Sequence, residues 1–210
     1  MYYVRRAARG AASGVARVQP FHGIVQSLNW IVESAGITEP ATMVTDYLLS
    51  GAAAFFAARL RRSFPPGRRR GNLWVMAFLT VSAAALAGGT MHGFALYLGA
   101  GPRTLLWNVT VALIALGAGL FLTAALSFRV SRSRARWLLG GLFVSLAGVA
   151  VQQSELAPHP DFNHNDVYHC IQIVGLYLLY RGASGGVRDA ASGRPTAARV
   201  TEAGRDRYEY

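Results

Sequence analysis

The chain has 210 residues, of which 52% are hydrophobic and only 15% are charged, whereas soluble domains have about 25% charged residues. It has 21 basic residues, all of them arginine, against 10 acidic ones, which gives a net charge of +11. The arginines cluster between long apolar runs, whereas a nucleic-acid-binding domain interleaves basic and polar residues on one face. The composition therefore excludes an ordinary soluble enzyme and argues against a nucleic-acid partner. Because Cys170 is the only cysteine, it also excludes a disulfide scaffold.

Residues 1–37 form an extension before the first clear apolar run. The segment 21–37 contains Asn29 and Glu33, so it is too polar for a transmembrane helix and is predicted to be an amphipathic helix at the membrane surface. No secretory signal peptide is expected, because no clean apolar stretch with a small-residue cleavage site follows the charged start. A biological start near Met43 is the alternative interpretation of this extension.

Five apolar runs of about the length that crosses a bilayer follow in the chain. They are residues 41–58, 72–98, 105–128, 137–151 and 161–180, the last of which is polar over its first six residues. A chain of this kind satisfies its backbone within helices, so the predicted fold is an all-α polytopic transmembrane bundle. We expect a membrane domain over residues 38–183 and a disordered tail over residues 184–210.

The arginines between the spans predict the orientation of the bundle. Arginine-rich loops follow the first, third and fifth spans, whereas the other two loops contain one arginine or none. We expect the protein to lie in the inner (cytoplasmic) membrane. The alternation then predicts that the arginine-rich loops and the C-terminus are on the cytoplasmic side. Tryptophans near the ends of the spans, including Trp74 and Trp107, are expected to anchor the helices at the interface.

Ionisable side chains inside spans are costly and therefore invite a functional explanation. Five of them fall in the outer third of three predicted spans, namely Asp46, His92, His164, Asp166 and His169. Small residues share the helix faces of the first two, with Gly88 and Gly89 one turn before His92, so neighbouring helices can approach closely there. We expect these polar groups to face one another inside the bundle.

Histidine and aspartate from several helices are suited to a Zn²⁺ site with an open position for an activated water. On this reading His92, His164 and His169 are the metal ligands, and Asp46 or Asp166 is the general base or orients a ligand. His164 and His169 are five residues apart, which is about 140° around an ideal helix, so both can be ligands only if His164 lies before the helix. The residues 161–166 are rich in capping types, so the last helix is expected to begin within them.

Three segments resemble a bacterial multi-pass membrane family of unassigned function. They are Gly88-Gly-Thr-Met-His-Gly93, Thr45-Asp-Tyr-Leu-Leu49 and Asp161-Phe-Asn-His-Asn-Asp-Val-Tyr-His169, and the resemblance spans about residues 38–183. More distantly, the chain resembles the membrane metallohydrolases that include alkaline ceramidases and adiponectin receptors.

The distant resemblance implies seven helices, hydrolysis of lipid amides, and a zinc held by one early histidine and a late pair. His92 would be the early ligand, with His164 and His169 as the late pair. Three features depart from that pattern: Gly88 stands where the superfamily has serine, the late pair is five residues apart where the superfamily has four, and five spans are predicted instead of seven.

Each candidate also has a plainer interpretation. His92 could make an interhelical hydrogen bond, Asp46 could cap the first helix, and His164 and His169 could belong to a polar loop at the water interface. Cys170 is more simply a small packing residue than a ligand.

Two classes of function follow. The first is a zinc-dependent hydrolase of a lipid-like amide or ester taken from the outer leaflet. The second is a non-enzymatic membrane binder that uses the same cluster, such as a haem protein, a proton-coupled transporter or a sensor. Membrane lipid is the partner that both classes imply.

Overall fold

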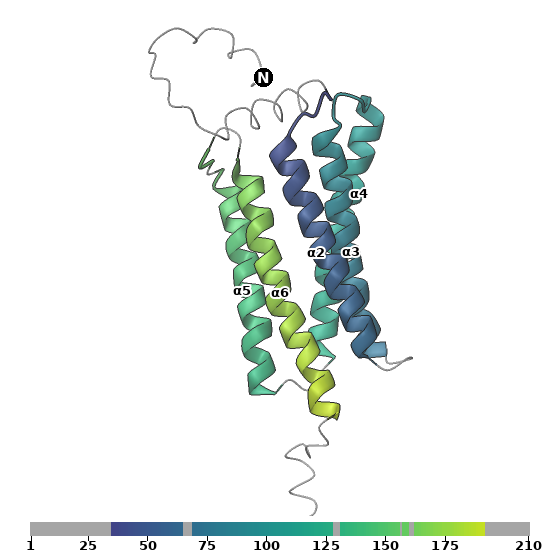
Figure 1. Ribbon diagram of the computed structural model, residues 1–210, viewed down its shortest axis with the longest axis vertical. Coiled ribbons are helices and arrows are strands. Elements are labelled where there is room, and N and C mark those ends of the chain that lie inside the picture. The colour runs from purple at the N-terminus through teal and green to yellow at the C-terminus, as the bar shows by residue number, and fades with distance from the viewer. Residues whose placement is uncertain (1–34, 65–68, 128–130, 156, 160–161, 192–210) are drawn as a thin grey trace, which may run out of the picture. The chain divides into compact units, whose positions relative to one another are not determined.

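The computed structural model describes residues 35–64, 69–127, 131–155, 157–159 and 162–191 (Figure 1). The chain divides into two units, residues 1–36 and residues 37–210, and the description below concerns the second unit. The predicted amphipathic helix at 21–37 falls almost wholly on residues outside the described ranges, as does the tail from residue 192 onward.

Five long helices make up the described part of the second unit, and no strand occurs among the described residues. They are α2 (Pro40–Ser63), α3 (Arg69–Gly93), α4 (Ala100–Leu126), α5 (Arg132–Gln153) and α6 (His164–Ala191). Each coincides with one of the five predicted runs, so the prediction of an all-α bundle is confirmed.

The helix ends differ from the predicted boundaries because a helical backbone can extend past the apolar stretch that a membrane would cover. α2 continues through Arg59, Arg61 and Arg62, whose long side chains are exposed and can reach water from a buried stem. α3 ends at Gly93, earlier than the predicted residue 98, and a turn over residues 94–99 leads into α4. α6 continues to Ala191, so the tail predicted to be disordered from residue 184 begins with helix.

Among the described residues, four helices are long and apolar enough to cross a membrane: α2, residues Gly71–Gly93 of α3, α4 and α5. The fifth predicted span, α6, has 28 residues but is not among these four. Its polar residues, including His169, Gln172 and Arg181, lower its hydropathy. Four apolar helices fit a membrane protein, and α6 is the more polar helix packed against two of them.

The helices pack in an open series and not in a closed ring. Close packing joins α5 to α6, α6 to α2, α2 to α3, and α3 to α4. Figure 1 shows α5 beside α6 and α2 beside α3. Within the described residues, α4 and α5 at the two ends of the series do not pack against each other to a comparable extent. The concave side of the series therefore lies between α4 and α5.

We name the two ends of the bundle by their residues. The polar end holds the first residues of α2 and α6 and the last residues of α3 and α5, where the predicted site residues lie. The arginine end holds the opposite helix ends, with Arg61, Arg62, Arg132 and Arg134. Arg134 is buried there and donates from Nε to the carbonyl oxygen of Gly182 (3.3 Å), which ties α5 to α6.

Aromatic side chains fill the core nearest the arginine end. The ring of Phe78 lies edge-on to that of Phe121, with 5.0 Å between centroids, and Phe56 stacks on Tyr180 at the same spacing. Trp74 is 1% exposed and packs on Phe121, so the prediction that it anchors the helix at the interface is wrong. Helix packing buries it because it lies on the face of α3 that meets α4. Trp107 is 52% exposed, as an anchor should be.

Glycines allow α5 and α6 to approach closely. A Cβ atom added to Gly141 would lie 3.0 Å from the carbonyl oxygen of Gly175 and 2.8 Å from Leu179, whereas one added to Gly140 would lie 3.8 Å from Leu178. We expect Gly141→Ala to lower the free energy of unfolding by about 1–3 kcal/mol, because the extra methyl overpacks the contact. Thermal unfolding in detergent checks this, with Gly140→Ala as the matched control. Equal stability of the two variants would contradict it.

Candidate functional site

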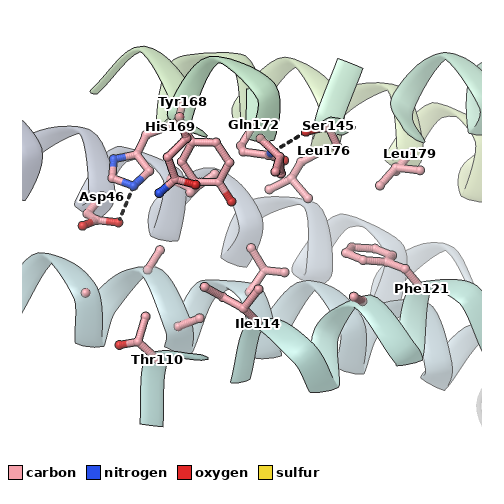
Figure 2. A pocket seen from close by; sticks show the side chains of 18 of the residues that line it. Asp46, Thr110, Ile114, Phe121, Ser145, Tyr168, His169, Gln172, Leu176 and Leu179 are labelled. Carbon is pink, nitrogen blue, oxygen red and sulfur yellow. Dashed lines mark hydrogen bonds and ion pairs between the residues drawn. The ribbon is translucent and has the colours of Figure 1, made fainter. Parts of the chain in front are cut away.

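The centre of the site is a buried pair between Asp46 of α2 and His169 of α6. Nε2 of His169 lies 3.2 Å from Oδ1 of Asp46, and the two side chains are 8% and 6% exposed. The other ring nitrogen, Nδ1, lies 3.0 Å from Oγ1 of Thr45. Both nitrogens of the imidazole are therefore held by neighbouring residues of α2, which fixes the ring orientation. Figure 2 shows this pair at one end of a pocket.

Asp166 lies in the first turn of α6, where it takes part in a capping arrangement. Asn163 is the residue before the helix, and its Oδ1 accepts a hydrogen bond from the backbone N–H of Asn165 (2.8 Å). In return, Oδ2 of Asp166 accepts the backbone N–H of Asn163 (2.6 Å), while Oδ1 accepts a hydrogen bond from Thr45 (3.4 Å). This reciprocal pattern is a capping box. The prediction that the last helix begins within residues 161–166 is confirmed, and Asp166 has a structural reason to be there.

A second histidine–carboxylate pair lies closer to the polar end. Nδ1 of His92 lies 3.1 Å from Oε2 of Glu39, the residue immediately before α2. The hydrogen bond from His92 holds the pKa of the Glu39 carboxyl below its usual value, against the opposing effect of partial burial. Thr38 reinforces this contact, because its hydroxyl donates to the carbonyl oxygen of His92 and its backbone N–H to that of Gly93 (3.0 Å).

The predicted site residues are brought to one end of the bundle but not into one cluster. Asp46 pairs with His169, whereas His92 pairs with Glu39, which precedes Asp46 by seven residues or roughly 10 Å of helix. The sequence predicted that these residues lie at one depth along the bundle, whereas the two pairs lie at different depths. The reason is that Asp46 of α2 and Glu39, the residue before it, each supply a carboxylate to a different histidine. His164 is the first residue of α6, is partly buried, and does not line the cavity described next.

A cavity of about 640 Å³ extends from the Asp46–His169 pair along the concave side of the bundle. Its polar end is lined by Asp46, Gly88, His92, Gln152, Asn165, Tyr168, His169 and Gln172. Beyond these residues the walls are apolar, with Ile114 and Phe121 from α4, Leu139 and Leu142 from α5, and Leu176 and Leu179 from α6. Figure 2 shows the polar side chains at one end and Phe121 and Leu179 at the other. The cavity is therefore amphipathic along its length.

The size of the cavity matches that of small-molecule sites, which are usually about 300–1,000 Å³. On α4 the lining runs from Trp107 to Ala125, roughly 27 Å at 1.5 Å per residue. That length approaches the hydrocarbon thickness of a bilayer, about 30 Å.

The side chains of the site do not form a metal-binding set as they are arranged. Within the described ranges, no group of three or more His, Cys, Asp or Glu residues could hold a metal ion. Both ring nitrogens of His169 and Nδ1 of His92 face protein partners. Cys170 is exposed on α6 and is no part of the cavity lining. A zinc ion would need at least His169 to exchange a protein partner for the metal.

Sequence reasoning missed Glu39 and Thr45. Glu39 lies outside the predicted span, just before Pro40, although an acidic residue at that boundary was a signal that could have been weighed. Thr45 attracts no attention because a threonine in a helix commonly bonds to its own backbone, as it does here to the carbonyl oxygen of Thr42 (3.1 Å). Its contact with His169 depends on the approach of α6, which the sequence alone does not give.

A comparison with protein families finds a match over most of the chain. The model of a family of unknown function (DUF6962) matches residues 41–132 and 124–187, which together cover all five helices almost completely. No curated protein and no solved structure matches the chain. The distant resemblance to membrane metallohydrolases therefore stays a sequence-based prediction.

Proposed function

The chain belongs to this family of unknown function, and because membership assigns no activity, we propose from the site itself that the protein binds a lipid-like amphiphile inside the membrane. The observation that carries the proposal is the amphipathic cavity, which has hydrogen-bonding groups at one end and hydrocarbon walls along the rest. A ligand with a polar head and an apolar chain would satisfy both regions. The open side between α4 and α5 would let such a molecule enter from the bilayer.

The orientation predicted from the arginines is part of this proposal. The arginine end faces the cytoplasm, because basic residues in short loops favour that side. The polar end of the cavity then lies in the outer leaflet of the inner membrane, and the C-terminus is cytoplasmic. The ligand would be drawn from the outer leaflet, with its chain directed toward the membrane centre.

Quenching of Trp74 fluorescence tests the binding proposal directly. Trp74 lines the cavity but is 1% exposed, so bulk lipid cannot contact it freely. In lipid nanodiscs, with the other three tryptophans replaced by phenylalanine, a single-chain amphiphile brominated along its chain should quench Trp74 saturably.

Two substitutions on α4 provide the blocked form and its control. Ala118→Phe places a large side chain in the cavity and should abolish saturable quenching, whereas Ala115→Phe, on the same helix but outside the lining, should leave it unchanged. Quenching that never saturates, or that is the same in both variants, would rule out the binding proposal.

Zinc-dependent hydrolysis of a lipid-like amide or ester is the second candidate. It is favoured by the fact that Asp46, His92 and His169, contributed by three helices, line the same cavity. It requires a rearrangement of the histidine partners described above, so we derive no reaction step from the present geometry.

Elemental analysis of detergent-purified protein tests the metal. A zinc site predicts about one equivalent per chain, its loss in His92→Ala and in His169→Gln, and its retention in Cys170→Ala. An absorption spectrum taken on the same sample would reveal a haem held by the two histidines. Folded protein without zinc or colour would remove both the hydrolase and the haem, and would leave amphiphile binding.

A further inference from the structure

We propose, building on the binding function above, that the preferred ligand is a single-chain amphiphile with a cationic amine head, and that Asp46 recognises the head. Only Oδ1 of the Asp46 carboxylate is paired with His169. Figure 2 shows the second oxygen turned away from the imidazole. A hydrogen bond to that oxygen is not found among the described residues.

Gly88 of α3 packs directly beside this second oxygen. A Cβ atom added to Gly88 would lie 3.3 Å from Oδ2 of Asp46, and both residues line the cavity. The absence of a side chain on Gly88 thus lets α3 approach the carboxyl closely, while Asp46 stays in the cavity wall. An N–H donor of a ligand head inside the cavity would pair with Oδ2, because charge-assisted hydrogen bonds to carboxylates are among the strongest available in proteins.

The remaining polar groups at this end also present acceptors. The amide N–H of Gln172 donates to the carbonyl oxygen of Ser145 (2.9 Å), and that of Gln152 donates to Oδ1 of Asn165 (3.1 Å). Each contact uses one of the two N–H donors of the amide, and a hydrogen bond to the carbonyl oxygen of either glutamine is not found among the described residues. A primary ammonium head carries three donors and no acceptor, which complements this set.

The charges near the head position favour a cation over an anion. Asp46 is the carboxylate in the lining, Glu39 and Asp166 lie close to the same end, and no arginine occurs among the described lining residues. The ionisable groups that face them are imidazoles, His92, His164 and His169. A phosphate or carboxylate head would meet Asp46 without a guanidinium to offset the repulsion.

The cavity volume limits the apolar part of the ligand. A site of about 640 Å³ encloses one small ligand, which suits a single chain and excludes a two-chain lipid held entirely inside. The long apolar lining on α4 lets that chain extend beside the helix.

Displacement of the brominated probe by unlabelled competitors tests the head specificity. Three competitors share one sixteen-carbon chain and differ in the head: a primary amine, an alcohol and a sulfate, each added as a mole fraction of a zwitterionic nanodisc at neutral pH. We expect the amine to displace the probe about tenfold or more better than the alcohol, and the sulfate to be the weakest.

Three variants connect this preference to the residues. Asp46→Asn should remove the advantage of the amine over the alcohol while keeping a similar shape. Gly88→Ala keeps the carboxyl but presses a methyl group to 3.3 Å from Oδ2, so it should disturb the pairing of this oxygen with the head and reduce the advantage. This variant carries the test if Asp46→Asn fails to fold. Gly119→Ala is the control, because an added Cβ there meets no atom within 4 Å.

The outcomes separate this inference from the function on which it rests. If no competitor displaces the probe and the probe itself does not bind saturably, the binding function fails. If all three displace it equally, or the sulfate is preferred, the binding function stands and the cationic head is wrong. An amine preference that survives in both Asp46→Asn and Gly88→Ala would overturn the role of Asp46.

Discussion

Replacing His169 with alanine is expected to lower the free energy of unfolding by about 1–3 kcal/mol, the usual cost of leaving a buried hydrogen-bonding group without its partner. The substitution leaves the Asp46 carboxylate, which is 6% exposed, without the imidazole 3.2 Å away. It also removes one of the partners of the Thr45 hydroxyl. Unfolding in detergent, followed by tryptophan fluorescence, measures the change.

Two further variants show that the loss comes from the pair. His164→Ala removes a histidine from the first turn of the same helix. Among the described residues the His164 side chain makes no hydrogen bond, so this variant should change the free energy of unfolding by about 0.5 kcal/mol or less. The double variant Asp46→Asn with His169→Ala should be less destabilised than the sum of the two single variants, since the two substitutions remove the same contact. A loss below about 1 kcal/mol for His169→Ala, or strict additivity, would contradict the buried pair.

Replacing Asp166 with alanine is the second large effect, and we expect a loss of about 1–3 kcal/mol. Asp166 is fully buried, and it supplies the acceptor for the backbone N–H of Asn163 at the start of α6. Without the carboxylate that N–H has no partner, and Thr45 loses a contact with α6. Hydrogen exchange should accelerate in the first turn of α6 more than in its middle.

The matched control is Asp166→Asn, which retains an oxygen at the capping position and should recover most of the stability. Asn163→Ala removes the other half of the capping box and should also accelerate exchange in the first turn. If Asp166→Ala left both stability and exchange unchanged, the capping role would be wrong, and the catalytic role predicted from the sequence would regain weight.

The helices were predictable from the sequence because each apolar run is long and the charged residues are clustered between the runs. The run that became α4 contains no ionisable side chain between residues 105 and 127, and its helix was predicted to within five residues at either end. The end of α6 was predicted less well, because the helix continues to Ala191, eleven residues beyond the predicted residue 180. Arg61 and Arg62 lie in the last turn of α2, because a helix can continue beyond the hydrocarbon with exposed charged side chains. A prediction based on apolar runs ends at the first charged residue and therefore misses that last turn.

The candidate site was predictable only as a set of residue types at one end of the bundle. Periodicity placed Asp46 and His169 on inward faces, and the structure joins them directly. Periodicity could not show which carboxylate pairs with which histidine, because the pairing depends on which helices are neighbours. α2 lies between α3 and α6, so Asp46 of α2 and Glu39, the residue before it, engage histidines on two different helices. The single metal cluster inferred from the sequence required all the histidines to face one point.

The pairing of Asp46 with His169 has a consequence for biosynthesis. The two residues belong to the first and the last described helices, and a chain made from the N-terminus places α2 in the membrane well before α6 leaves the ribosome. During that interval the aspartate has no imidazole beside it, and a charged group in hydrocarbon is costly. Completion of the last helix therefore supplies the buried partner of Asp46, so we expect a nascent chain cut short before residue 164 to be a substrate for membrane quality control.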